Sequence, residues 1–286
     1  MRTGIDITDT TSISVANLRE VAASADQLGV EIIYLSDGGN LDAVTVAVGL
    51  RDVATRARLA AEVRVTARSN PVHIAERVSV ADQILEGRLI LVLRGDDAGV
   101  LHQTAEAVTE ATMSRPFSLP GSERVNVTVT PSPLQPILPI WLRGTTASEA
   151  SARLGLSVVG EVSDDTADLR TVWSSIEAHC GVWARTRLNR PAFRSLQMAP
   201  DGQLDVAATT SSLVADRSEW GIDVVLFVAP VGGWNNESLV ALQTRVRPRL
   251  QLGEIPPGIE QFWDDTHSPS VNAEVPAPYA ITWRSE

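Results

Sequence analysis

The chain has 286 residues and a formal net charge of −11, because 35 Asp and Glu residues outweigh 24 basic residues. This acidic surplus excludes a general nucleic-acid binder, which needs a basic face to displace counterions. All 24 basic residues are arginine, which excludes Schiff-base chemistry on lysine and a lysine-dependent phosphate loop of the Walker type. The one cysteine, Cys180, excludes an intrachain disulfide and a cysteine-rich metal site.

The amino-terminal residues, MRTGIDITDTTS, lack the apolar core of a secretion signal. No apolar run in the sequence reaches the roughly 18 residues that a membrane span needs. We therefore expect a soluble cytoplasmic protein that has no membrane partner.

Short apolar runs alternate with longer amphipathic stretches along the whole chain. The runs IIYL, LILVL and VVLFV are apolar on both faces, which is typical of parallel strands covered by helices. Strands are expected at Thr3–Thr8, Glu31–Asp37, Leu59–Ala67, Arg88–Gly95, Pro139–Gly144, Leu156–Glu161, Ala192–Met198 and Ile222–Pro230. A helix is expected after each strand, over about Ser14–Leu28, Leu41–Arg56, Pro71–Glu86, Val100–Thr112, Thr145–Gly155, Asp165–Thr186, Val206–Trp220 and Glu237–Leu250.

The strand–helix rhythm predicts an α/β fold. Eight such units in about 250 residues match a closed (β/α)8 TIM barrel better than an open doubly wound sheet. We expect residues 1–252 to form this single barrel domain. Residues 253–286 are acidic and contain several prolines, so we expect a carboxy-terminal tail that packs on the barrel or trails from it.

Two groups of residues at the carboxyl ends of the expected strands suggest phosphate binding, because the active site of a parallel barrel lies at that end. The turn Gly144–Thr145–Thr146 stands between a strand and a helix, where hydroxyls and backbone N–H groups would face an anion. Arg94 and Arg143 end neighbouring strands, and either could supply a bidentate guanidinium. The alternative is that Thr145 or Thr146 caps its helix and the two arginines make surface ion pairs.

Other candidate groups at the strand ends leave their chemistry open. Asp6, Asp37 and Glu161 could be paired carboxylates in one mouth, and separate helix caps and loop anions explain them equally well. The four histidines show neither H-x-x-x-H nor H-E-x-x-H spacing, so no metal site is expected. A Ser-His-Asp triad stays open, although no G-x-S-x-G sequence supports it.

Three segments carry a resemblance to a known family, and together they span about Ser24 to Glu161. They are SADQLGVEIIYLSD, VRVTARSNPVHIAERVSVADQILEGRLILVLRGDD and PSPLQPILPIWLRGTTASEASARLGLSVVGE. The first resembles the first helix and second strand of the luciferase-like superfamily. The second resembles its third strand, its P-x-x-x-A helix and its fourth strand, which ends in R-G or G-x-G. The third resembles its P-x-P-P-I-x-x-G-G-S segment with the helix and strand that follow.

The resemblance implies an oxidoreductase or monooxygenase on a (β/α)8 barrel, with FMN or a deazaflavin (F420) across the barrel mouth. A small organic substrate is implied, and reduced FMN would come from a separate flavin reductase. Arg94 matches an arginine that contacts the cofactor phosphate in some members, and Thr66–Ala67 lies where some members have a non-proline cis peptide beneath the flavin ring. The cofactor-binding positions expected are Thr66, Ala67, Arg94, Gly95, Arg143, Gly144, Thr145 and Thr146.

The end of the second strand departs from the family pattern. Flavin-dependent members usually carry E-H-H there and deazaflavin-dependent members carry S-D-H, whereas this chain has Ser36-Asp37-Gly38. The family histidine commonly assists chemistry at the ring, so Gly38 puts the usual catalytic route in doubt. Asp37 is then the candidate catalytic group near the ring, and Glu161 is a second carboxylate candidate.

Three functions remain under consideration. The leading one is an oxidoreductase that uses a deazaflavin or reduced FMN for hydride transfer or oxygen insertion. The second is a non-catalytic relative that serves as a subunit, a flavin carrier or a ligand binder, and the third is an unrelated barrel hydrolase or lyase. An open cleft lined by Arg94, Thr145 and Asp37 would favour the oxidoreductase. A mouth plugged by Trp or Arg side chains would favour the non-catalytic relative. Relatives dimerise through helices beside the second and third strands, so we expect a homodimer.

Overall fold

The structure of the protein is a computed structural model. It describes residues 1–7, 14–37, 42–113, 116–117, 127–144, 146–161, 166–180, 188–198, 204–230 and 233–252. Thr145, Gly38 and the expected tail at 253–286 lie outside these described residues.

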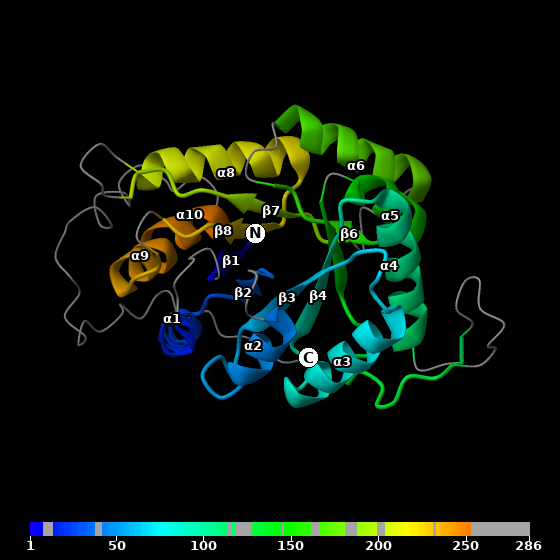
Figure 1. The fold of residues 1–286 in the computed structure, drawn as a ribbon. Helices are drawn as coiled ribbons and strands as arrows, with labels where there is room; N and C mark the ends of the chain where they lie inside the picture. The colour runs from blue at the N-terminus through cyan, green and yellow to red at the C-terminus, as the bar shows by residue number, and fades with distance from the viewer. Residues whose placement is uncertain are drawn as a thin grey trace, which may run out of the picture.

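Eight parallel strands form one sheet that curls into a barrel (Figure 1). They are β1 (Arg2–Asp6), β2 (Ile32–Leu35), β3 (Arg58–Arg64), β4 (Leu89–Arg94), β5 (Ile140–Arg143), β6 (Ser157–Val158), β7 (Pro191–Arg194) and β8 (Val224–Phe227). Their order is β6-β5-β4-β3-β2-β1-β8-β7, and a parallel bridge between Gly160 and Ala192 joins the two edges. At this seam the Gly160 N–H donates to the Pro191 carbonyl at 3.0 Å, and the Phe193 N–H donates to the Gly160 carbonyl at 2.9 Å. The predicted (β/α)8 barrel is confirmed.

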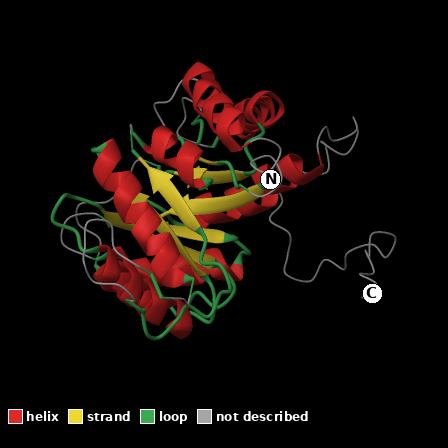
Figure 2. Cartoon of the chain, turned by 90° about the vertical axis from the view of Figure 1, so that its right-hand side faces the viewer, coloured by secondary structure: helices red, strands yellow, loops and turns green. Residues whose placement is uncertain are grey.

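Helices surround the strands in both views (Figures 1 and 2). They are α1 (Val15–Gln27), α2 (Ala43–Gly49), α3 (Pro71–Ile84), α4 (Ala98–Thr112), α5 (Ala147–Leu154), α6 (Thr166–Cys180), α8 (Val206–Trp220), α9 (Asn236–Ala241) and α10 (Arg247–Leu252), with a π-helical turn, η1 (Leu242–Val246), between the last two. None of the helices in the described ranges has the length and apolar character that a membrane crossing requires.

Local sequence signals set where several helices begin. The side chain of Ser14 accepts the Asn17 N–H at the start of α1, and Asp97 accepts the Val100 N–H at the start of α4. Asn70 caps α3 in the same way, and Pro71 occupies its first turn, where a missing N–H costs nothing. These caps fix the helix starts close to the strand ends that precede them.

The helix after the second strand is shorter than predicted, because α2 ends at Gly49 rather than near Arg56. The chain then turns, with the N–H groups of Val53 and Ala54 bonded to the Leu50 carbonyl. The buried carboxylate of Asp26 holds the end of this turn by accepting the N–H groups of residues 56 and 57 at 2.9 and 2.7 Å. Because of this long-range contact, α2 ends earlier than the local sequence pattern predicts.

Two separate apolar cores stabilise the barrel. The larger core lies between the strands and the helices, and the smaller one fills the barrel interior, where Tyr34, Trp141 and Phe193 are the largest side chains. Because the interior is packed, as in other barrels of this kind, a ligand meets the barrel at its carboxyl-terminal mouth.

Candidate active site

Three arginines stand in register at the mouth, one at the end of each of β3, β4 and β5. The strand pairing sets Arg64 opposite Arg94 and Arg94 opposite Arg143. Neighbouring strands lie about 4.8 Å apart, so the row extends over about 10 Å of the rim. The structure therefore places Arg94 and the turn after Arg143 on one rim, as the sequence predicted. Arg64 was not singled out from the sequence.

The turns that follow β4 and β5 touch each other at two glycines. Gly144 has a φ of +120°, and a Cβ atom on it would lie 2.5 Å from the carbonyl oxygen of Gly95. The Gly95 N–H also donates to the Arg143 carbonyl at 3.2 Å. Only glycine allows this close approach of two backbones. The contact sets the starts of α4 and α5 side by side at the rim.

The amino end of α5 differs from that of α4, because no side chain caps it. Thr146 occupies the N-cap position without a capping hydrogen bond, and its Oγ1 atom is buried with no partner in the described structure. Threonine at an N-cap normally accepts a backbone N–H, so the alternative in which Thr146 caps its helix is wrong. An uncapped helix start beside an arginine suits an anionic group such as a phosphate.

Arg94, like Arg64, makes only a long contact to a carboxylate, in contrast to Arg143. Its side chain is 44% exposed, and its Nη1 atom lies 3.5 Å from Oε1 of Glu62, at the limit of a hydrogen bond. A guanidinium carries five N–H donors. Arg94 can therefore bind an anion at the rim without leaving a buried partner unpaired.

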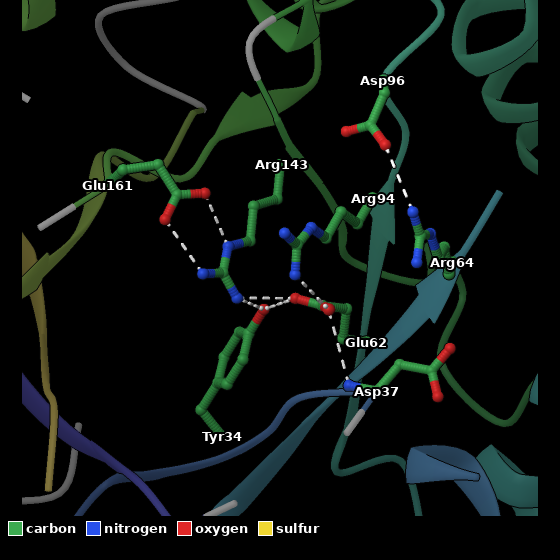
Figure 3. Close-up of polar contacts among 8 residues, drawn as sticks. All are labelled: Tyr34, Asp37, Glu62, Arg64, Arg94, Asp96, Arg143 and Glu161. Atoms are coloured by element: carbon green, nitrogen blue, oxygen red, sulfur yellow. Dashed lines mark hydrogen bonds and ion pairs between the residues drawn. The ribbon is translucent and has the colours of Figure 1, made fainter. Parts of the chain in front are cut away.

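Arg143 lies at the centre of the mouth, in a network of hydrogen bonds and ion pairs (Figure 3). Its Nε and Nη2 atoms donate to the two oxygens of Glu161 at 2.7 and 2.9 Å. Its Nη1 atom donates to Oε2 of Glu62 at 2.7 Å and to the hydroxyl of Tyr34 at 3.2 Å. The guanidinium also lies over the ring of Phe193, with 4.4 Å from Cζ to the ring centroid. These are buried contacts, so the alternative of a surface pair is wrong for Arg143.

Glu62 is the buried hub of this network. Its side chain is 1% exposed, and it accepts the Tyr34 hydroxyl at 2.5 Å as well as the Arg143 guanidinium. The Asp37 N–H approaches its other oxygen at 3.4 Å. A buried carboxylate in an apolar barrel is stable only when it is paired and hydrogen-bonded in this way. Neither Glu62 nor Tyr34 was predicted from the sequence; the signal for Glu62 is an acid inside the apolar run LAAEVRV.

The network changes the ionisation of its members. Burial raises the pKa of Tyr34 well above its usual value, and the negative charge of Glu62 adds to the rise. Burial by itself would lower the pKa of Arg143, but its bonds to Glu161 and the charges around it raise that pKa instead. Tyr34 is therefore held neutral and Arg143 is held charged.

The two candidate catalytic carboxylates have different surroundings. Glu161 is held by two bonds from Arg143, so it belongs to the central network. The Asp37 side chain is exposed at the end of β2 and points away from Arg143 in Figure 3. Asp6, at the end of β1, is buried. The Asp37 carboxylate thus points away from the network that holds Glu161, while the charge of Asp6 acts on Tyr34 within that network.

The remaining predicted positions lie at the same end of the barrel. Thr66 and Ala67 are exposed just after β3, in a turn where the Thr66 N–H donates to Ser69 Oγ at 3.0 Å. Within the described ranges the cis peptide bond is Thr130–Pro131, and the Thr66–Ala67 bond is trans. No three His, Cys, Asp or Glu side chains in those ranges gather closely enough to hold a metal ion.

Comparisons with known proteins agree with this architecture. The family model described as luciferase-like monooxygenase matches residues 2–160, more than half of the chain. The chain belongs to the luciferase-like monooxygenase family. No curated protein matches it in sequence.

Several solved luciferase-like structures have the same fold. Monooxygenase RslO1 from Streptomyces bottropensis superposes with a TM-score of 0.69 at 16% identity, over 87% of this chain and 99% of that one. The coenzyme F420 dependent tetrahydromethanopterin reductase from Methanopyrus kandleri gives a TM-score of 0.67 at 12% identity, with the same coverage of both chains. The oxygenating constituent of 3,6-diketocamphane monooxygenase from Pseudomonas putida, solved in complex with FMN, also gives a TM-score of 0.67 at 12% identity. It is matched over 87% of this chain and 99% of that one. At these identities the likeness shows the fold alone.

Proposed function

We propose that this protein is an oxidoreductase that binds a flavin-type cofactor, FMN or F420, and acts on a small organic substrate. The observation that carries the proposal is the rim between β4 and β5. There Arg94, with only a 3.5 Å contact to Glu62, stands beside the uncapped start of α5 and the Gly95–Gly144 contact. The phosphate of the cofactor is the anion that we assign to this rim.

The solved relatives support this choice of cofactor. The Methanopyrus kandleri reductase is F420 dependent, and the Pseudomonas putida protein is in complex with FMN. Either cofactor would supply the electron or hydride chemistry, which amino-acid side chains alone do not provide. If reduced FMN is used, a separate flavin reductase delivers it.

The protein residues then have defined tasks. Arg94, Gly95, Gly144 and the start of α5, with Thr145 and Thr146, hold the phosphate. Thr66 and Ala67 would support the ring, and Asp37 is the carboxylate that we assign to the chemistry at the ring. Arg143 and Glu161 are bonded to each other at the centre of the mouth, where they would exclude water from the barrel interior.

A second function, that of a non-catalytic barrel, is favoured by one specific observation. The Arg143 side chain is 14% exposed and engaged with two carboxylates, so an arginine plugs the mouth. Together with Gly38 in place of the family histidine, this plug would suit a subunit, flavin carrier or ligand binder. Such a protein would bind the cofactor at the rim without turnover.

A binding titration followed by a turnover assay tests both functions. We expect the purified protein to bind FMN or F420, and Arg94→Gln to weaken that binding about tenfold or more, the loss typical of one charge-assisted contact. Arg68→Gln, which changes an exposed arginine beyond the β3 end, is the matched control and should leave the affinity unchanged. Oxidation of the reduced cofactor in the presence of substrate supports the oxidoreductase, and binding without turnover supports the non-catalytic barrel. Absence of binding to both cofactors overturns the proposal.

We also propose that the protein is a homodimer that associates through α2 and α3. A cavity of about 420 Å³ lies between these helices, and valines 44, 48 and 80 form much of its wall. Val80 is 43% exposed and lines the same cavity as valines 44 and 48, so its exposed apolar surface belongs to a larger patch. Burial of this apolar surface against a second copy would stabilise the dimer.

A further inference from the structure

The ion pair between Arg143 and Glu161 has the geometry with which an arginine binds the carboxylate of a ligand. Arg143 presents its Nε–Nη2 edge to Glu161, and these two atoms donate to the two carboxylate oxygens at 2.7 and 2.9 Å. Such a pair of parallel hydrogen bonds is the arrangement in which a guanidinium recognises a planar carboxylate. The side chain of Glu161 therefore occupies a carboxylate-binding position at the centre of the mouth (Figure 3).

Other contacts hold Arg143 in place independently of Glu161. The Nη1 atom of Arg143 donates to Glu62 at 2.7 Å and to the Tyr34 hydroxyl at 3.2 Å. Its Cζ atom lies 4.4 Å from the centroid of the Phe193 ring. Glu62 is buried and lies on a different side of the guanidinium from Glu161 in Figure 3. The Nε–Nη2 edge therefore keeps its position for a new partner when the Glu161 side chain moves away.

Glu161 lies closer to solvent than Arg143 and Glu62 do. Its side chain is 32% exposed, whereas those of Arg143 and Glu62 are 14% and 1% exposed. Rotations of exposed side chains take picoseconds to nanoseconds and need no change of the backbone. The bridge between Gly160 and Ala192 keeps the preceding main chain in the barrel wall. Glu161 can therefore turn toward solvent while the barrel stays closed.

A ligand that takes the place of Glu161 must match the two hydrogen bonds that it breaks. Bonds from a guanidinium to an ionised acceptor are roughly twice as strong as bonds between neutral groups. A carboxylate supplies two charged oxygens in one plane, whereas a neutral amide supplies a single acceptor oxygen. Of these two groups, the carboxylate is the one that replaces Glu161 without loss.

We propose that Arg143 binds a carboxylate of the substrate, and that Glu161 occupies this position until the substrate arrives. The inference rests on the proposed function and deepens it, because it assigns the substrate to the small organic carboxylic acids. The arginine that plugs the mouth is then also the residue that selects the substrate. Glu161 competes with the substrate as a tethered carboxylate, so removal of its charge should strengthen substrate binding.

Two glutamine variants test the inference with the same change of net charge. Glu161→Gln removes the competing charge at the mouth and keeps the length of the side chain. Glu149→Gln removes the same charge from the exposed pair that Glu149 forms with Arg153 on α5. A general gain in affinity for anions would appear in both variants, so a difference between them reports on the position beside Arg143.

The probes are butyrate and butyramide, which have nearly the same shape and differ in charge. Ligand-observed NMR titration measures their dissociation constants for the full-length wild type and both variants. We expect the wild type to bind butyrate about tenfold more tightly than butyramide, roughly the gain from one charge-assisted contact. Glu161→Gln should bind butyrate about tenfold more tightly again, because its tethered competitor is gone. Glu149→Gln should bind both probes as the wild type does.

Two results overturn the inference, and neither touches the proposed function, which the cofactor titration tests. One is equal affinity for butyrate and butyramide in both the wild type and Glu161→Gln. The other is the same butyrate affinity in Glu161→Gln and Glu149→Gln. A protein that prefers butyrate in the expected way but binds neither FMN nor F420 overturns the proposed function, while the carboxylate site at Arg143 stands. Circular dichroism of each variant establishes that a changed affinity does not come from a lost fold.

Discussion

At the scale of single residues, the structure of the barrel mouth depends on charged side chains that are buried next to one another. Glu62 sits on β3, yet its strongest partners are Tyr34 on β2 and Arg143 on β5, the second of them 81 positions away in sequence. Removal of one member of such a group leaves a buried charge unpaired, which is why the members depend on one another. The network occupies the space above the barrel interior, so the centre of the mouth is filled by side chains and is not an open cleft.

The raised pKa of Tyr34 predicts how stability falls at alkaline pH. The folded state holds the Tyr34 proton, while the unfolded chain releases it near the ordinary tyrosine pKa of about 10. The stabilisation is therefore fully present below about pH 10 and is lost as the pH rises further. At pH 11 the wild type should have lost about 1.4 kcal/mol of unfolding free energy from this source.

The measurement is urea unfolding of wild type and Tyr34→Phe at pH 8 and pH 11. The phenylalanine variant is expected to start less stable, because Glu62 loses its 2.5 Å hydrogen bond, and to lose less between the two pH values. The chain has no lysine, so few other groups titrate in this window. An equal alkaline loss in both proteins would show that Tyr34 is not the group responsible.

At the scale of elements, the contact between the β4 and β5 turns predicts that Gly144→Ala damages both the fold and the site. Its Cβ would meet the Gly95 carbonyl at 2.5 Å, and a φ of +120° is strained for any residue with a side chain. We expect a loss of about 3 kcal/mol in unfolding free energy, from backbone strain and the steric clash together. Chemical denaturation should show no such loss for Gly49→Ala, whose Cβ enters open space in a helix. A Gly144→Ala protein as stable as wild type would refute the strain argument.

Most of the fold could be predicted from the sequence because strand–helix alternation is a local pattern. All eight strands overlap the apolar runs that predict them, and each is followed by a helix. The differences are non-local in origin. The helix α2 ends early where Asp26 anchors the turn after it, and β6 is two residues long, with a single bridge from Gly160 closing the barrel beyond it. The shared rim of Arg94 and Gly144 followed from strand order, whereas the partners of Arg143 required three-dimensional contacts that no spacing encodes.

At the scale of the whole molecule, the negative net charge of the chain opposes the association of two copies that we propose. A net charge of −11 opposes the approach of two copies, so any interface should be poor in unpaired charge. The face formed by α2 and α3 is rich in valine, and its charges are of both signs, with Arg77 paired to Asp42 at 2.9 Å and Glu76 lining the cavity between the two helices.

This face gives a prediction for the oligomeric state. Val80→Glu would place a charge at the centre of the proposed interface, where its desolvation has no compensating partner, so the dimer should dissociate at micromolar concentration. Val214 is equally exposed, at 42%, and the helix that carries it, α8, lies across the barrel from α3 in Figure 1. Val214→Glu is therefore the matched control and should remain dimeric. Light scattering coupled to size-exclusion chromatography distinguishes the two masses. A monomeric wild type would refute the dimer itself, and a dimeric Val80→Glu would place its interface on another face of the barrel.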